Sequence, residues 1–175
     1  MVSAVLSTLA TKSYVDTFAS GINIHASCVY ATTADLGSVT YNNGSSGVGA
    51  TLTNAGTQAA LAIDGHTFTN TDVTNAVRVL VKNESNAAYN GIYTVTNEGS
   101  GSTNWVLTRA TDYDTGGTGA GAISVGDYTF ITSGSTNAYT SWVQTTTGTV
   151  TVGTTNLVFA QFSQATQYTG TAPIN

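Results

Sequence analysis

The chain has 175 residues, of which 41% are hydrophobic and only 7% are charged, and its net charge is −5 with four Lys and Arg residues in total. Soluble proteins are ordinarily about 25% charged, so the polar surface here must consist of neutral residues such as threonine, serine and asparagine. So few basic residues exclude a patch for nucleic acid or an anionic membrane, and one cysteine excludes an intrachain disulfide or a thiolate metal cluster.

Residues 1–21 predict a helical or linker segment. Apolar residues recur there at three- and four-residue spacings, typical of an amphipathic helix that ends at Gly21, and the candidate anchor or oligomerisation residues are Leu6, Leu9, Tyr14, Val15 and Phe18. So short a helix needs a partner in water, either its own domain or copies of itself. A frayed terminus is the alternative. No basic region precedes the apolar part and no apolar run could span a bilayer, so we expect mature chain, neither a secretory signal nor a membrane insertion.

From residue 22 the pattern changes to a period of two. In INIHASCVYA, alternate residues from Ile24 to Tyr30 would share one strand face, and further short runs follow: VGATLT, QAALAI, VRVLVK, GIYTVT, NWVLTR, DYTFIT, TSWVQT and NLVFAQF. Gly-, Asn- and Asp-rich turns separate them, and Asp64-Gly65 is a strong hairpin signal. We therefore predict an all-β fold, an antiparallel sandwich or barrel-like domain over residues 22–163, with a C-terminal tail over residues 164–175.

The stretch from Arg78 to Arg109 predicts a three-strand meander. Alternation places Arg78 and Lys82 on one face, and we expect Arg109 to share that face with them, exposed to solvent. Glu84 and Glu98 lie in the adjoining turns and are the expected charge partners. Exposed pairs of this kind contribute about 0–1 kcal/mol, so we interpret these charges as markers of strand register and protection of sheet edges.

Candidate metal and catalytic residues are few. Asp112 and Asp114, followed by Thr-Gly-Gly, resemble the start of a calcium loop, but Ile123 holds the position of the last ligand. A turn held by aspartate side chains is the simpler interpretation. The same pair in an open glycine-rich loop is a poor acid and nucleophile for glycan hydrolysis, so we expect neither an enzyme nor a bound cofactor.

The histidines and the cysteine give no catalytic pair. On a strand, positions 25 and 28 face opposite sides, so His25 and Cys28 cannot share a site there. Cys28 is expected in the core and His25 on a half-exposed strand. His66, directly after the Asp64-Gly65 turn, is a candidate to line an axis between identical chains.

Aromatic residues are the remaining candidates for recognition. Trp105 and Trp142 lie in predicted strands, where we expect them to be core residues. Tyr89 and Tyr139 lie in predicted loops, and their rings are the candidate contacts for a glycan. The sequence leaves a recognition role and a structural role open for both tyrosines.

Beyond these patterns, RVLVKNESNAAYNGIYTV, with WVLTRATDYDT and SWVQTTTGTVTVGTTNLVFAQFS, resembles a β-domain that recurs in bacteriophage virion proteins, especially tail fibres. ATKSYVD, residues 10–16, is similar to an ATKxYVD segment that joins a trimeric shaft to the next domain in phage fibres. The resemblance covers about residues 10–163. One departure is the approach to the first strand, which reads TNAVRVLVK where the family has a Gly-Asp turn. The family shares no catalytic site, so no catalytic residue is carried over.

The resemblance implies a homotrimeric virion component that is made in the host cytoplasm and released by lysis. We expect a tail or head fibre that serves attachment or presentation, with other virion proteins and a host-surface glycan as further partners. One alternative is a capsid decoration protein that stabilises the head at quasi-threefold sites. Another, from a different class, is a carbohydrate-binding module or a depolymerase fragment.

Overall fold

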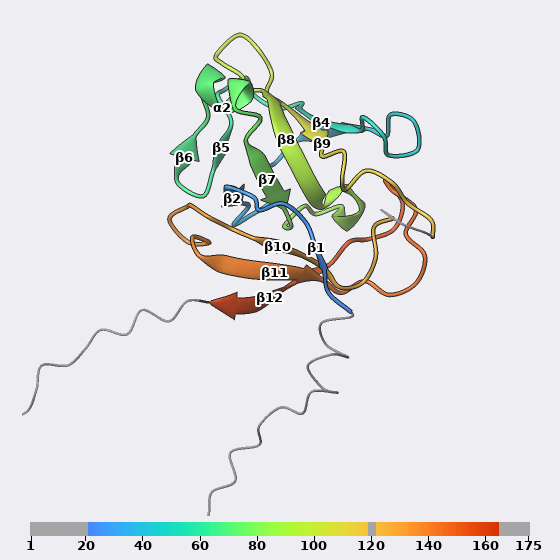
Figure 1. Cartoon of the computed structure of the whole chain (residues 1–175). Helices are drawn as coiled ribbons and strands as arrows, with labels where there is room; N and C mark the ends of the chain where they lie inside the picture. Colours follow the sequence, from blue (N-terminus) through green and yellow to red (C-terminus); the bar gives the residue numbers. More distant parts are fainter. Residues whose placement is uncertain (1–20, 119–121, 165–175) are drawn as a thin grey trace, which may run out of the picture.

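The computed structural model describes residues 21–118 and 122–164, which form three β-sheets and one short α-helix (Figure 1). The predicted all-β class is therefore confirmed. The sheets are mixed, because two strands pair in parallel with their neighbours, and they do not close into a barrel. Leu6, Leu9, Tyr14, Val15 and Phe18 lie outside the described residues, as does the tail from residue 165 onward.

A six-stranded sheet forms the centre of the molecule. Its strand order is β2-β7-β8-β9-β4-β3, with β2 Tyr30–Ala31, β7 Arg78–Val81, β8 Gly91–Asn97, β9 Val106–Arg109, β4 Thr51–Asn54 and β3 Val39–Asn42. The predicted meander is confirmed, since β7, β8 and β9 pair in antiparallel order. β2 pairs in parallel with β7, a pairing that the alternation of residues alone does not predict.

A four-stranded sheet lies below the first in Figure 1. Its order is β1-β10-β11-β12, with β1 Asn23–Ile24, β10 Asp127–Phe130, β11 Thr140–Gln144 and β12 Phe159–Gln164. β1 is parallel to β10, and the register between β11 and β12 shifts beside Trp142. The predicted continuous strand over residues 22–31 is thus wrong: β1 belongs to one sheet and β2 to the other.

The third layer is the hairpin of β5 (Ala62–Ile63) and β6 (His66–Thr67), followed by α2 (Asn70–Thr74). Asp64 and Gly65 both have positive φ angles, 51° and 81°, as a two-residue hairpin turn requires, so the predicted hairpin is confirmed. At the start of α2, Asp72 Oδ2 accepts a hydrogen bond from the Thr69 amide at 2.8 Å. A short 3-10 helix, η1 (Ala87–Tyr89), precedes β8.

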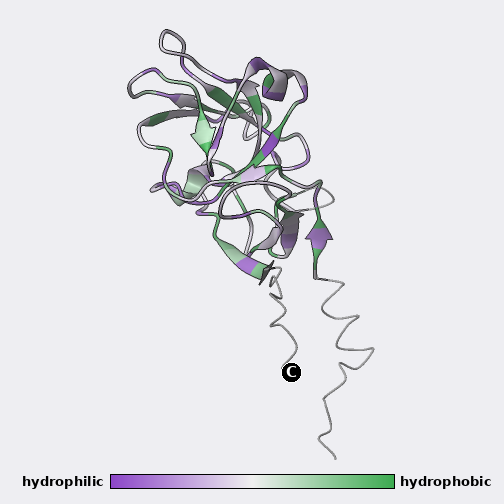
Figure 2. Ribbon diagram, turned by 90° about the vertical axis from the view of Figure 1, so that its left-hand side faces the viewer, coloured by the Kyte–Doolittle hydropathy of each residue, from purple (hydrophilic) through white to green (hydrophobic). Residues whose placement is uncertain are grey.

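Two hydrophobic clusters hold these layers together. One fills the space between the two large sheets and includes Leu80, Ile92 and Ile131. The other lies on the opposite face of the six-stranded sheet, where Val79 clusters with Ile63 of β5 and with Phe68, directly after β6. Residues on both faces of β7 are therefore buried. Figure 2 shows hydrophobic segments, coloured green, distributed through the whole domain.

Among the described residues, no helix combines the length and the hydropathy needed to cross a membrane.

Candidate functional site

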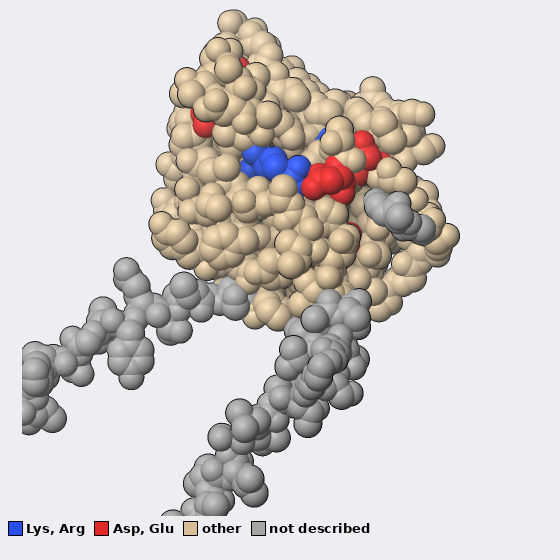
Figure 3. Space-filling view, viewed as in Figure 1, with Lys and Arg blue, Asp and Glu red and all other residues tan. Residues whose placement is uncertain are grey.

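Arg78, the first residue of β7, and Lys82, directly after β7, lie at the junction between the two large sheets. Arg78 and Lys82 flank Leu80 on the face toward the four-stranded sheet. Both terminal nitrogens of Arg78 donate to the Asp112 carboxylate at 2.9 Å, and Lys82 Nζ lies 4.1 Å from the centroid of the Trp142 ring. Figure 3 shows a basic and an acidic area side by side on one face of the molecule. The partner of Arg78 is thus Asp112, and the predicted pairing with Glu84 or Glu98 is wrong.

Arg109 is buried, so the prediction that it shares an exposed face with Arg78 and Lys82 is wrong. Its side chain is 1% exposed, and Nη1 and Nη2 donate to the Asn90 carbonyl at 3.1 and 3.2 Å. The guanidinium carbon lies 4.9 Å from the centroid of the Tyr93 ring, on the face of the sheet opposite Leu80. The cation is therefore held inside the sheet by a carbonyl and an aromatic ring, an environment that can stabilise a buried guanidinium.

Glu84 and Glu98, in the turns of the meander, both accept hydrogen bonds from backbone amides. Glu84 is buried, and its Oε1 accepts from the Leu36 amide at 3.0 Å. Burial raises the pKa of this carboxyl. The Glu98 carbonyl accepts from the Leu61 amide at 2.7 Å. Both residues connect the meander to neighbouring loops.

His25 connects the two acidic side chains that meet at the sheet junction. Its side chain is 8% exposed, with Nδ1 at 3.5 Å from Asp112 Oδ2 and Nε2 at 3.2 Å from Asp127 Oδ1. Burial acts to lower the pKa of His25, but the hydrogen bond and charge of Asp127, together with Asp112, outweigh it and raise the pKa. The residue as a whole is of intermediate exposure, as predicted, but the predicted strand position is wrong, because His25 lies directly after β1 and bridges two carboxylates.

Cys28 is a core residue, as the sequence predicts. It is fully buried, and Thr129 Oγ1 lies 3.6 Å from its sulfur. Burial raises the pKa of the thiol to about 11, which keeps it protonated and unreactive at neutral pH. His66 stacks on Tyr30, with ring centroids 4.4 Å apart, and lies 3.2 Å from Asp72 Oδ1.

Asp112 and Asp114 point to different partners. Asp112 binds Arg78 and His25, and although burial acts to raise its pKa, the hydrogen bond and charge of Arg78 lower it. Asp114 is buried and accepts from Thr115 Oγ1 at 3.1 Å. Within residues 21–118 and 122–164, no group of three or more His, Cys, Asp or Glu side chains is arranged to hold a metal ion.

The candidate aromatic residues differ in exposure. Trp105 is a buried core residue, which confirms that prediction, and Trp142 is partly buried against the inter-sheet cluster. Tyr89 stacks on Tyr41 with ring centroids 4.5 Å apart. Tyr139, in the connection between β10 and β11, is 64% exposed with a φ of 61°. Of the two predicted glycan contacts, only Tyr139 offers an open ring.

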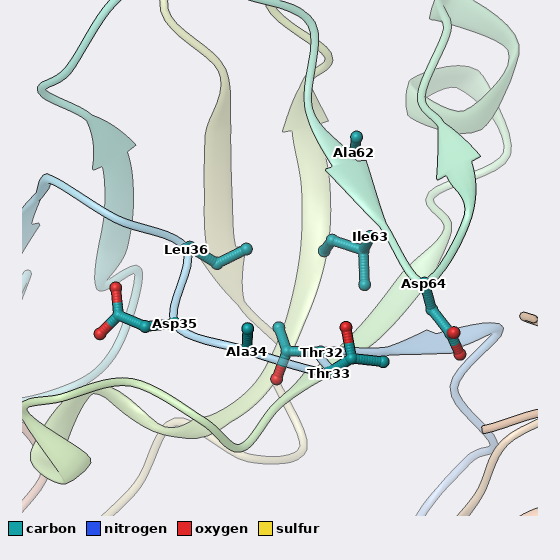
Figure 4. A pocket seen from close by; sticks show the side chains of 8 residues that line it. All are labelled: Thr32, Thr33, Ala34, Asp35, Leu36, Ala62, Ile63 and Asp64. Atoms are coloured by element: carbon teal, nitrogen blue, oxygen red, sulfur yellow. The ribbon is translucent and has the colours of Figure 1, made fainter. Parts of the chain in front are cut away.

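A small polar hollow of about 100 Å³ lies between residues 32–36 and β5, with Asp35 and Asp64 at its opposite ends (Figure 4). Asp35 accepts from the amides of Gly37 and Ser85, each at 2.6 Å. Asp64 accepts from the amides of Thr136 and Asn137 at 2.8 and 2.9 Å. Both carboxylates are therefore occupied by the backbone, and they join loops rather than form an acid–base pair.

The four-stranded sheet carries an apolar surface on the side away from the six-stranded sheet. Strand register aligns Ile24, Tyr128, Val143 and Ala160 in one row across all four strands. We call this surface the outer face and define it by six residues: Ile24, Val125, Tyr128, Phe130, Val143 and Phe162. Ile24 is 75% exposed and Phe162 is 43% exposed. The opposite side of the sheet packs against the inter-sheet cluster through Trp142 and Phe159.

The outer face contains a hollow of about 280 Å³. Gly21 and Ile22 line it at the start of the described chain, together with Val125, Val143 and Phe162. The rings of Tyr128 and Phe162 meet edge to face, with centroids 5.8 Å apart. The sequence shows the alternation along β10 and β11. It does not show which of the two sheet faces another layer would cover.

Comparison with known proteins finds no matching family model, no matching curated protein and no matching solved structure.

Proposed function

We propose that the protein is a structural component of a bacteriophage particle, a homotrimeric tail or head fibre that holds or presents an attachment tip. The observation that supports the proposal is that each basic side chain among the described residues has a partner within the domain. Arg78 binds Asp112, Lys82 lies over the Trp142 ring, and Arg109 is buried. The fourth basic residue, Lys12, lies outside the described residues.

This use of charge leaves a mainly neutral surface of threonine, serine, asparagine and glycine. Neutral side chains can be buried against another protein without the desolvation penalty of an ion. Such a surface suits permanent assembly better than turnover of a charged substrate. The resemblance of the meander and its flanking strands to phage fibre domains supports the same assignment and provides its setting, the virion.

Labelling of purified particles tests the proposal. Antibodies raised against residues 22–163, visualised by electron microscopy, should label one class of appendage on the particle. Label spread over the head shell would favour the alternative of a decoration protein. Particles that carry no label, from lysates in which the protein is abundant, would overturn the assignment to the virion.

A host-glycan contact at Tyr139 is a narrower proposal, supported by the exposure of its ring. Aromatic rings on loops are suited to stack on sugar faces. Tyr139→Ala should leave the unfolding midpoint unchanged and reduce adsorption of particles to cells. Tyr89→Ala is the matched control, since Tyr89 stacks on Tyr41 and its loss should lower stability without affecting adsorption. Normal adsorption of the Tyr139 variant would remove the glycan proposal and leave the structural one intact.

A further inference from the structure

We infer that the outer face of the four-stranded sheet is the surface through which copies of this chain associate. The inference rests on the proposed function for the number of copies, three. It adds the location of the contact, which neither the composition nor the resemblance provides. The partner that covers the outer face is thus a second copy of the same domain.

The first support is the continuity of the apolar surface. Single exposed hydrophobic residues are normal on any protein, whereas contiguous apolar patches mark interaction sites. Ile24, Tyr128 and Val143 are neighbours in one row of the sheet, and the Tyr128 and Phe162 rings are in contact. The hollow beside Phe162 gives the surface relief into which a side chain of another copy can insert.

The second support is the absence of charge from this surface. Identical chains that meet around a symmetry axis bring identical residues close together, so a charge near the axis would face its own copy. Asp127 is the only charged residue in β1, β10, β11 and β12. It is 2% exposed and points inward to His25, so the outer face can approach itself without like-charge repulsion.

The third support is the position of the two chain ends. Gly21 and Ile22 line the hollow, and β12 ends at Gln164 on the edge of the same sheet (Figure 1). Residues 1–20 and 165–175 therefore both join the domain at this sheet. Association through the outer face would bring three copies of residues 1–20 together. The candidate oligomerisation residues predicted from the sequence, with Leu6, Leu9 and Phe18 among them, precede this junction in the chain.

The test uses the full chain and measures its mass in solution by light scattering. The wild-type mass should equal three chains of 17.9 kDa. Val143→Asp with Phe162→Asp places two charges on the outer face, and we expect the mass to fall threefold. Val48→Asp is the matched control, because Val48 is 53% exposed in the loop between β3 and β4, away from this sheet. Its mass should stay at three chains.

Ile24→Asp is a second variant in case the double variant fails to fold. Ile24 is 75% exposed on a two-residue edge strand, so its replacement should leave the circular dichroism spectrum unchanged while association weakens. Folded outer-face variants that keep the mass of three chains would overturn the inference. A wild-type single chain whose outer face binds a hydrophobic dye only after deletion of residues 1–20 would also overturn it, since its own segment would then cover the face.

These results are separable from the proposed function. Labelled particles together with outer-face variants that remain trimeric would retain the virion role and remove this interface. Unlabelled particles together with monomeric outer-face variants would retain the interface and remove the virion role.

Discussion

The two large sheets consist of similar short strands but differ in what covers them. The six-stranded sheet has the inter-sheet cluster on one face and the β5–β6 hairpin with α2 on the other. The four-stranded sheet has the same cluster on its inner face, whereas its outer face exposes Ile24, Phe130 and Phe162. Burial of a strand residue in this protein therefore depends on the layers around the strand. Under the association proposed above, the six-stranded sheet serves stability and the four-stranded sheet serves assembly.

The largest effect is expected where the six-stranded sheet encloses Arg109. A Cβ at position 91 would lie 2.1 Å from Arg109 Nη1, and Gly91 has a φ of 149°. Because Arg109 is buried, its guanidinium cannot move into solvent to make room. Gly91→Ala should therefore lower the free energy of unfolding by about 3 kcal/mol or more, as measured by urea denaturation.

Gly49→Ala is the matched control for this prediction. Gly49 also has a positive φ, 69°, but a Cβ there would have no neighbour within 4 Å. The loss in the free energy of unfolding of Gly49→Ala should be limited to backbone strain, roughly 1 kcal/mol. Equal losses in the two variants would mean that the close contact with Arg109 has no energetic weight.

A smaller and more local effect is expected in the four-stranded sheet. A Cβ at position 126 would lie 1.7 Å from the Gly21 carbonyl oxygen, at the point where the Asn23 amide donates to the Gly126 carbonyl. Gly126→Ala should displace β1 and cost roughly 1–2 kcal/mol. The amides of Asn23 and His25 should exchange with solvent about tenfold faster, because they would open locally. Unchanged exchange at both amides would show that β1 is not held by this contact.

The smallest effect is a pH dependence at the sheet junction. Because Asp127 and Asp112 raise the pKa of His25 above its usual value of 6.5, protonation stabilises the fold. This contribution is fully present below pH 6.5 and is lost as the pH rises through the raised pKa. Urea titrations of the wild type should show stability falling over that window, relative to His25→Gln. Parallel pH profiles for the two proteins would contradict the bridging role of His25.

Much of the fold could be predicted from the sequence, because its signals are local. The Asp64-Gly65 turn fixes a hairpin through its own backbone angles, and alternation identifies the meander of β7, β8 and β9. The strand at Val39–Asn42 was missed because its alternation covers only four residues and runs directly into the turn cluster that begins at Asn42. The helix at Asn70–Thr74 was missed because five residues are too few to show a helical period.

The environments of particular side chains could not be predicted in the same way. Alternation within residues 22–31 predicts a common face for Ile24 and Cys28, yet Ile24 is exposed and Cys28 is fully buried. Ile24 pairs with Tyr128 and Cys28 with Ile131, so the register shifts by one residue between them. The chain crosses to the six-stranded sheet only after Cys28, where the Val29 amide donates to the Arg78 carbonyl. The contact of His25 with Asp112 and Asp127 joins residues far apart in the sequence. The exposure of the outer face within the described part of the chain has no local signal in the sequence, since it depends on which layers are present around the sheet.

The crossing segment also has a consequence for biosynthesis. β1 pairs with β10, and the Asn23 side chain donates to Asp127, 104 residues later in the chain. A ribosome must therefore release most of the domain before its first strand can find its place. Contacts of such long sequence separation slow folding and leave the early strands without partners during synthesis. Because the chain carries little charge, we expect nascent chains to be most prone to aggregate in the interval between synthesis of β1 and synthesis of β10.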